Sequence, residues 1–318
     1  DALLLIEQFG ADGMRFGVLS SSPAGGDLKF DTKLCENGRN FCNKLWNALR
    51  LIKGWNITEG TLSESQAKIN SLAGDWMHHR ISGILVEIES NFKTYRLSEA
   101  LVTVYSFIWD DFCSWYLEMI KPKYGEATDQ ATVDAAVEIF EKLMLILHPF
   151  MPFITEEIWQ QLRERDQSTA CIISSYPTPS STDAGLLSNM ERIKDAISKI
   201  REVRNNRGLK MSELLEVFIL DSAQSRELFQ LAGANELVVK LGNLGYLEFT
   251  SVEIENSVAF LAQTEQYFVK LEQKIDIEEE REKLTKELNY FTGFVASIEK
   301  KLSNEKFVNG APPAVIDN

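Results

Sequence analysis

The chain has 318 residues, 44% of them hydrophobic and 25% charged, a balance typical of folded proteins with two or three domains. Its net charge of −14 excludes a uniformly basic nucleic-acid binder, because such proteins present a positively charged footprint. The longest nearly uncharged apolar run, residues 143–154, is too short to cross a bilayer, so we expect a soluble cytoplasmic chain without membrane contact.

The start of the chain predicts two short helices and a loop. Asp1 is placed to cap a helix that Gly10 ends, and residues 11–20 continue with a second helical pattern. The stretch SSPAGGDLKFD, residues 21–31, is rich in Gly, Ser and Asp and indicates a loop.

Residues 33–53 predict a long helix with two different faces. Apolar side chains at helical spacing form one face, with Cys42 at its edge: Phe41, Leu45, Ala48, Leu49 and Ile52. The opposite face carries Arg39, Asn43, Trp46, Arg50 and Lys53. Five cations oppose one anion along this helix, which gives it a local surplus of positive charge in an otherwise acidic chain. Such a chain can bind phosphates at one face and repel them elsewhere.

The tryptophan on the polar face has two interpretations, and both stay open. Trp46 can pack against a neighbouring helix with its N–H bonded. It can also offer a stacking surface for an RNA base between two guanidinium groups, while nearby amides read base edges. The candidate binding residues are Arg39, Asn43, Lys44, Trp46, Asn47, Arg50 and Lys53.

A series of amphipathic segments follows and predicts an antiparallel helical bundle, because short polar connections join most of them. The expected helices are 74–93, 98–120, 130–148 and about 153–165. Ser98 is the expected N-cap of the second of these helices.

The composition changes after the bundle. Residues 173–185, rich in Ser, Thr and Pro, indicate a linker. A helix over 186–206 and short alternating runs then predict a small α+β unit with a mostly antiparallel sheet. The expected strands lie within 214–220, 246–254, 257–262 and 265–271, with helices at 222–232 and 235–241.

The last segment predicts one helix of a coiled coil. Apolar residues recur at heptad positions, with Arg281 as the exception: Ile277, Leu284, Leu288, Phe291, Val295, Ile298 and Leu302. We expect residues 277–303 to be helical. Because a lone helix with this stripe is unstable in water, the body of the protein or a second copy should cover it.

The sequence offers no recognisable catalytic or metal-binding set. Cysteines without paired spacing and histidines remote from them predict neither zinc nor disulfides: Cys35, Cys42, Cys113, Cys171, His78, His79 and His148. Asp110 and Asp111 are adjacent on a helix and therefore diverge, which favours a structural role. The run LKMSELLEV, residues 209–217, lacks the second lysine of a Lys-Met-Ser-Lys-Ser loop, and a strand directly follows it.

Four stretches together resemble the valyl-tRNA synthetases, a family of class I aminoacyl-tRNA synthetases. They are GRNFCNKLWNALR, FCSWYLEMIKP, HPFMPFITEEIWQ and KLSNEKFVNGAPPAV. The third stretch is also similar to leucyl and isoleucyl enzymes, so the first and fourth are the most discriminating. The opening residues resemble the segment that follows the Lys-Met-Ser-Lys-Ser loop in this family.

The resemblance implies a mainly α fold, with a helical anticodon-binding domain, a small α+β unit and a coiled-coil arm. The implied division is a junction at 1–32, the anticodon-binding domain at 33–172, a linker at 173–185, the α+β unit at 186–272 and a truncated arm at 273–318. The nucleotide-binding catalytic fold and the editing domain would precede Asp1. In the arm, Pro312 or Pro313 would begin a returning helix.

The same resemblance implies a role in binding tRNA(Val) through its anticodon and elbow. The parent enzyme would be a monomer that uses valine, ATP and Mg²⁺, whereas this chain alone is expected to be catalytically inactive and to need no cofactor. Nearly balanced charges along the arm would permit the fragment to self-associate. The alternatives are a helical protein-interaction scaffold, or the equivalent part of an isoleucyl or leucyl enzyme.

Overall fold

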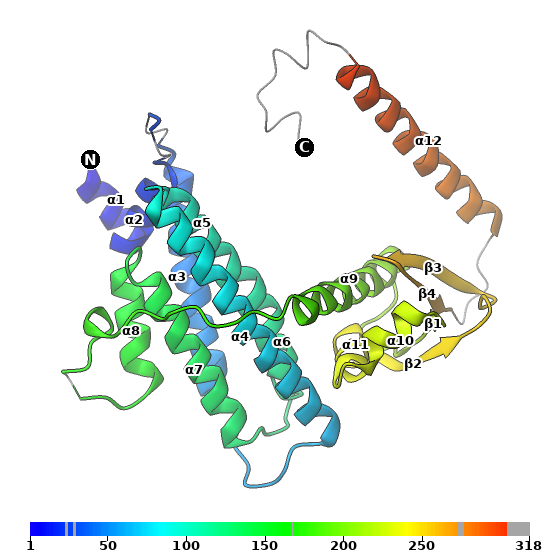
Figure 1. Cartoon of the computed structure of the whole chain (residues 1–318), viewed down its shortest axis with the longest axis horizontal. Helices are drawn as coiled ribbons and strands as arrows, with labels where there is room; N and C mark the ends of the chain where they lie inside the picture. Colours follow the sequence, from blue (N-terminus) through cyan, green and yellow to red (C-terminus); the bar gives the residue numbers. More distant parts are fainter. Residues whose placement is uncertain (23–24, 28–29, 167, 272–276, 304–318) are drawn as a thin grey trace.

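The fold was analysed in a computed structural model that describes residues 1–22, 25–27, 30–166, 168–271 and 277–303. Within 277–303, the described side chains are those of 281, 285–286, 288–300 and 302–303. A helical bundle occupies one end of the molecule, a four-stranded sheet lies at the other, and a separate helix follows the sheet (Figure 1). None of the helices in the described part combines the length and apolar composition that crossing a bilayer requires.

The two predicted N-terminal helices are confirmed as α1 (Ala2–Phe9) and α2 (Ala11–Ser20). Asp1 caps α1, because its carboxylate accepts a hydrogen bond from the Leu3 N–H at 2.9 Å. Gly10 separates the helices at a φ of 79°, a conformation that side chains with a Cβ adopt with difficulty. The chain can therefore turn sharply between them.

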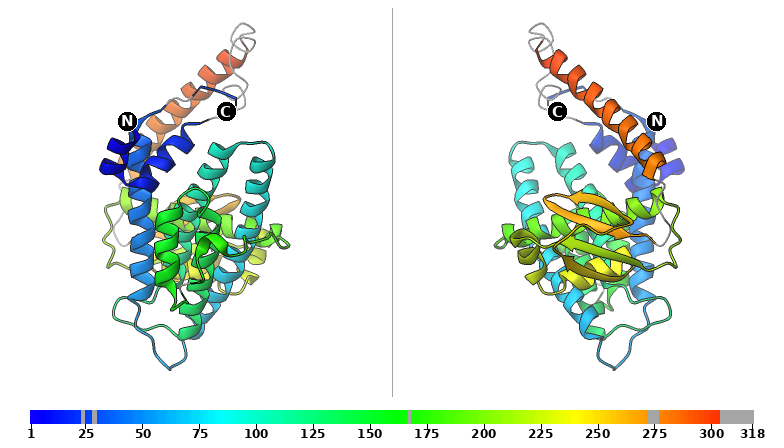
Figure 2. Two further views of the ribbon diagram at one scale, coloured as in Figure 1. Left: turned by 90° about the vertical axis from the view of Figure 1, so that its left-hand side faces the viewer. Right: turned by 90° about the vertical axis from the view of Figure 1, so that its right-hand side faces the viewer.

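The two-faced helix is confirmed as α3 (Thr32–Lys53), which runs along one side of the bundle (Figure 2, left). Asp31 caps its first turn by accepting a hydrogen bond from the Lys33 N–H at 2.9 Å. All five apolar residues of the predicted inner face are buried, from Phe41 to Ile52. Helical periodicity therefore placed the core stripe of α3 correctly.

The remaining bundle helices differ from the predictions mainly at their ends. They are α4 (Glu64–Lys93), α5 (Leu97–Ser106), a π-helical segment (Phe107–Tyr116), α6 (Leu117–Ile120), α7 (Gln130–Leu147) and α8 (Pro152–Leu162). Helix α4 begins ten residues before the predicted start, because Ser63 accepts a hydrogen bond from the Gln66 N–H and caps it there.

The predicted cap at Ser98 is wrong. Arg96 occupies the N-cap position of α5 without a side-chain hydrogen bond, and Ser98 lies inside the helix. The Ser98 hydroxyl instead donates to the carbonyl of Ser20 at 3.0 Å, which ties α5 to the end of α2. A tertiary contact has replaced the local one that the sequence suggested.

The α+β unit has the predicted mixture of helices and strands. It contains α9 (Ala184–Asn206), β1 (Leu215–Leu220), α10 (Ala223–Gln230), α11 (Ala234–Gly242), β2 (Leu244–Thr250), β3 (Ser257–Ala262) and β4 (Glu265–Lys270). The strand order is β2-β1-β4-β3, and the right-hand view of Figure 2 looks onto this sheet. Within this sheet β1 and β2 pair in parallel, and the other two strand pairs are antiparallel, so the prediction of a mostly antiparallel sheet is confirmed.

The segment predicted as a linker lies against α4. Ser180 and Ser82 exchange two hydrogen bonds, of 2.6 and 2.8 Å, between side chain and backbone. Beyond it, Lys194 of α9 donates to the buried carboxylate of Asp111 at 3.0 Å, which Arg80 also contacts at 2.6 Å. Asp111 therefore has a structural role, and α9 joins the bundle to the sheet.

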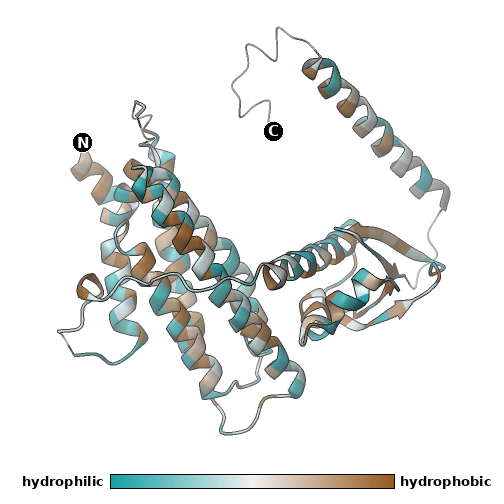
Figure 3. Ribbon diagram, in the orientation of Figure 1, coloured by the Kyte–Doolittle hydropathy of each residue, from teal (hydrophilic) through white to brown (hydrophobic). Residues whose placement is uncertain are grey.

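Helix α12 (Ile277–Leu302) confirms the predicted helix at the end of the chain. It stands apart from the bundle and sheet (Figure 1), and apolar residues recur along it (Figure 3). Phe291 is 59% exposed and Val295 52% exposed, so the expectation that the body covers this stripe is wrong for the described residues. Coverage by a second copy stays a prediction, and the returning helix expected at Pro312 or Pro313 lies outside the described residues.

Candidate nucleic-acid interface

The outward face of α3 presents cations and amides to solvent. Arg39, Asn43, Arg50 and Lys53 are exposed, as helical spacing predicted, and Asn47 is exposed beside them. They occupy the side of the helix opposite the buried stripe, so core packing holds the helix while this face stays accessible. The helix is thus a rigid support for these side chains.

Two cations near the first half of α3 already have aromatic partners. Arg39 forms an ion pair with Glu36 at 3.4 Å and lies 5.7 Å above the ring of Phe9. Lys44 is half-buried, and its ammonium lies 5.2 Å from the ring centre of Trp109. These contacts orient both cations, and they reduce the freedom of Arg39 and Lys44 to meet a ligand.

The second half of α3 is more open. The side chains of Asn43, Asn47 and Arg50 make no hydrogen bond or ion pair with any residue in the described part of the chain. Lys53 donates to the carbonyl of Gln161 at 2.9 Å, at the end of α8. Free hydrogen-bonding groups therefore gather toward the C-terminal end of α3.

Trp46 is half-buried and packs against the core. Part of the indole thus contributes to packing, as the first interpretation expected, and part remains at the surface. The two interpretations of Trp46 are compatible in this geometry, because one side of the residue is exposed beside Asn43 and Arg50.

Sequence reasoning missed the contribution of the segment after α8. A shallow hollow beside the end of α3 is lined by Lys53, Gln160, Gln161, Leu162, Arg163, Glu164 and Arg165. Both arginines contact Glu141, and Arg165 also lies over the ring of Trp159. The sequence shows that residues 163–166, RERD, are charged, but it does not show that they lie beside α3, because the tertiary fold places them there.

Two side chains of α2 form hydrogen bonds with the backbone of the turn between α7 and α8. The Asp12 carboxylate accepts hydrogen bonds from the backbone N–H groups of Phe153 at 3.4 Å and Ile154 at 2.6 Å, and so caps α8 from another helix. Arg15 donates to the carbonyls of Phe150 at 3.0 Å and Pro149 at 3.2 Å. Burial raises the pKa of Asp12, and the two N–H donors oppose that rise.

Comparison with known protein families gives two matches. Residues 74–219 match a family described as the anticodon-binding domain of tRNA ligase, and residues 276–318 match the valyl tRNA synthetase tRNA binding arm. A valine–tRNA ligase of Christiangramia forsetii is 42% identical over 99% of the chain. The chain belongs to the valyl-tRNA synthetase family. The resemblance seen in the sequence is therefore confirmed.

Other members of the valyl-tRNA synthetase family also match the chain along its whole length. Valine–tRNA ligases of Parabacteroides distasonis and Symbiobacterium thermophilum are 41% and 32% identical over the whole chain. The chain spans about a third of the length of these relatives, 35% of the first two and 37% of the third. None of the three is an isoleucyl or leucyl enzyme, so they give those alternatives no support.

A solved structure of a leucyl-tRNA synthetase from Agrobacterium radiobacter, in a ternary complex, was also compared. It aligns with 86% of this chain and 30% of its own, with a TM-score of 0.39 and 13% identity. A likeness of this size carries no argument about fold or function.

Proposed function

We propose that this chain is the tRNA-binding portion of a valine–tRNA ligase. The helical bundle would hold the anticodon loop of tRNA(Val), and α12 would contact the elbow. A catalytic domain like that of the longer relatives would join valine to the tRNA with ATP and Mg²⁺. The observation that carries the proposal is the open set formed by Asn43, Asn47 and Arg50 on α3, in a chain that matches the family along nearly its whole length.

The chemistry of this face suits a single-stranded loop. An unpaired base can stack on an indole or a guanidinium plane, and amides can bond its edge. Asn43, Asn47 and Arg50 offer these groups without first breaking a contact within the described protein. The acidic remainder of the chain repels phosphates and so favours this one face.

The test is a titration of the full chain with a tRNA(Val) transcript and with the same transcript carrying an altered anticodon loop. Arg50→Ala should weaken binding and reduce the slope of log affinity against log salt by about one unit. Trp46→Ala should cost about 1–3 kcal/mol of binding free energy if a base stacks there. Arg96→Ala, an exposed arginine in the α4–α5 turn, is the matched control and should change neither quantity.

Thermal unfolding of the same variants separates the two roles of Trp46. A large loss of stability with unchanged RNA affinity would assign Trp46 to packing alone. The rival function is a helical scaffold that docks a partner protein through this face. RNA binding through phosphates weakens steeply with added salt, whereas apolar docking does not. Absence of salt-dependent tRNA binding would favour the scaffold, and equal affinity for both transcripts would contradict anticodon recognition.

A further inference from the structure

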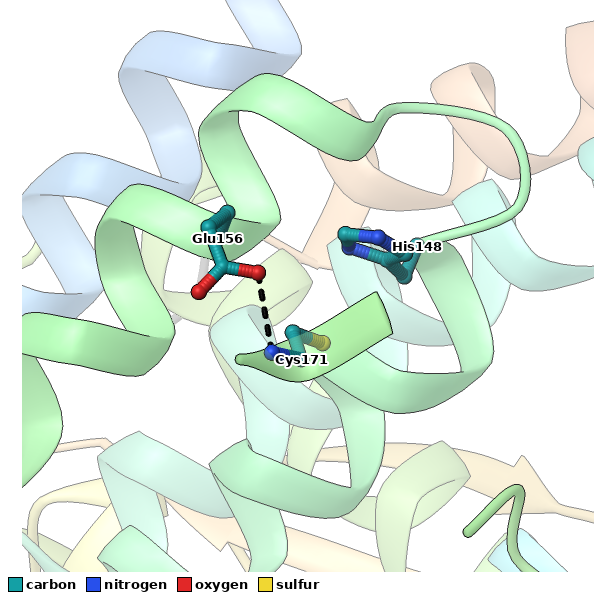
Figure 4. Close-up of side chains that lie close together, drawn as sticks. All are labelled: His148, Glu156 and Cys171. Atoms are coloured by element: carbon teal, nitrogen blue, oxygen red, sulfur yellow. Dashed lines mark hydrogen bonds between the residues drawn. The ribbon is translucent and has the colours of Figure 1, made fainter. Parts of the chain in front are cut away.

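Three side chains with metal-binding atoms meet beside the α7–α8 turn (Figure 4). His148 follows the end of α7, Glu156 lies in α8, and Cys171 begins a short 3₁₀ turn, Cys171–Ile173. One nitrogen, one carboxylate oxygen and one sulfur lie within 4.8 Å of one another. Spacing along the chain gave no hint of this cluster, because 23 positions separate the histidine from the cysteine.

The hydrogen bonds around His148 fix which ring nitrogen is free. The Thr155 hydroxyl donates its own proton to the Met151 carbonyl at 2.7 Å, so its oxygen can only accept at the 2.7 Å contact with His148 Nδ1. Nδ1 therefore carries the proton, and Nε2 keeps a lone pair that can accept a hydrogen bond or bind a metal. Nε2 is buried and has no hydrogen-bond partner in the described structure. An unpartnered acceptor of this kind is costly unless something binds it.

Glu156 and Cys171 are held in place by hydrogen bonds. The Cys171 N–H donates to Glu156 Oε2 at 2.8 Å, as the dashed line in Figure 4 shows. Gln160 donates to the other carboxylate oxygen at 2.8 Å. The Cys171 side chain is buried, and the Glu156 side chain is partly so. The carboxylate is thus fixed beside the sulfur without a cation of this chain paired to it among the described residues.

We propose that His148, Glu156 and Cys171 form a binding site for a divalent zinc-type cation, with water as the fourth ligand. Imidazole nitrogen, carboxylate oxygen and thiolate sulfur are all zinc ligands, and sites with three protein ligands and one water are common. The proton on Nδ1, held by Thr155, directs Nε2 toward the metal. A dication, one thiolate and one carboxylate sum to zero charge, which suits a buried position.

Binding at this site balances chemically as a proton exchange. The Cys171 thiol gives its proton to solvent, a sulfur–metal bond forms, and no oxidant or reductant takes part. The bound ion would join the end of α7, the first turns of α8 and the 3₁₀ turn. These three elements surround the turn that α2 also grips, so the ion would stabilise the bundle near its N-terminal helices.

The test uses the full chain after removal of metals with a chelator. Zinc added by dialysis should bind at one equivalent per chain, measured by elemental mass spectrometry. Cobalt should give a thiolate charge-transfer band and the intense visible bands of a tetrahedral site. Cys171→Ser should weaken zinc binding by more than about 100-fold, because loss of a ligand exceeds the 10–100-fold cost of a second-shell change. Thr155→Val removes the partner of Nδ1 and should weaken zinc binding by about 10–100-fold.

Cys113→Ser is the matched control, since Cys113 is also a buried free thiol but lies outside the cluster. It should bind zinc as the unmodified chain does. Glu156→Gln keeps an oxygen that can accept from the Cys171 N–H, and it replaces the serine variant if that one fails to fold. The proposal is overturned if the unmodified chain takes up no zinc, or if Cys171→Ser and Glu156→Gln bind zinc as tightly as it does. In either case the three side chains are packed together without forming a zinc site.

Discussion

Lys240 places its ammonium group between the α+β unit and the bundle. It extends from α11 and donates to Gln66 Oε1 at 2.7 Å and to the carbonyls of Met119 and Lys121, both at 2.8 Å. Burial lowers the pKa of Lys240 to about 8, from an ordinary value of 10.5. One partly buried cation thus connects two regions that the sequence analysis treated as separate domains.

The depressed pKa makes the contribution of Lys240 depend on pH. Between pH 8 and 10.5 the unfolded chain holds this proton and the folded chain has released it, so the free energy of unfolding rises with pH. The difference in the free energy of unfolding between the unmodified chain and Lys240→Met should shift by about 1–3 kcal/mol in favour of the unmodified chain from pH 8 to pH 10.5. Urea unfolding at several pH values measures this difference. Lys93→Met, at an exposed lysine, should give a constant difference, and a constant difference for Lys240→Met would refute the expectation.

Helices α2 and α3 approach each other so closely that only glycine fits at their contact. A Cβ built on Gly38 would lie 2.6 Å from the Cβ of Phe16, and one on Gly17 would lie 2.4 Å from the Cys35 sulfur. These distances are far shorter than a van der Waals contact, and the first involves an atom that cannot rotate away. The stretch GRNFCNKLW therefore contains a packing requirement as well as a polar face.

Gly38→Ala should destabilise the fold by about 1–3 kcal/mol, because α2 must move to relieve the overlap. Gly83→Ala is the control: a Cβ at Gly83 of α4 meets no atom within 4 Å. It should be neutral or stabilising by up to about 1 kcal/mol, since alanine favours a helix. Thermal unfolding of both variants tests the pair. Equal stability of the two would show that α2 and α3 separate without cost.

At the level of elements, the sequence predicted the features that depend on neighbouring residues, such as the buried face of a helix and its N-cap. The spacing of Phe41, Leu45 and Leu49 located the buried face of α3, and Asp1 was recognised as a cap. Patterns could not predict the π-helical segment Phe107–Tyr116, because packing decides it; the Ser114 hydroxyl donates to the Trp109 carbonyl within this segment. The cap from Asp12 to α8 and the meeting of His148 with Cys171 join distant parts of the chain. They become visible only in the folded structure.

The candidate RNA-binding face was predicted more fully than its surroundings. The exposure of Asn43 and Arg50 followed from helical periodicity alone. The half-burial of Trp46 did not, because it depends on which helix lies beside it. The arginines after α8 were missed for the same reason. Residues on one helix could be assigned to a face, and residues contributed by another helix could not.

At the scale of the whole molecule, the exposed stripe on α12 predicts self-association. Apolar side chains such as Phe291 and Val295 lie open to water, and the charges along the helix nearly balance, so repulsion does not oppose pairing. Sedimentation of the full chain should show a concentration-dependent dimer. Replacing both residues by Gln should leave a monomer, whereas Leu3→Gln, at a more exposed apolar position of α1, should leave the dimer intact. A monomer at every concentration would contradict this prediction.

The grip of α2 on the α7–α8 turn has a mechanical consequence. Asp12 and Arg15 hold opposite ends of one chain reversal, and the glycine contact fixes α2 against α3. Hydrogen bonds and close packing therefore hold α2, α3 and the α7–α8 turn to one another. Helix α3 has 22 residues and so spans about 33 Å, with Arg50 and Lys53 near one end and the N-terminal helices near the other. Because its apolar face is buried along most of this length, any movement of α3 on binding at the arginine end would be shared with the bundle core and with α2 near the other end.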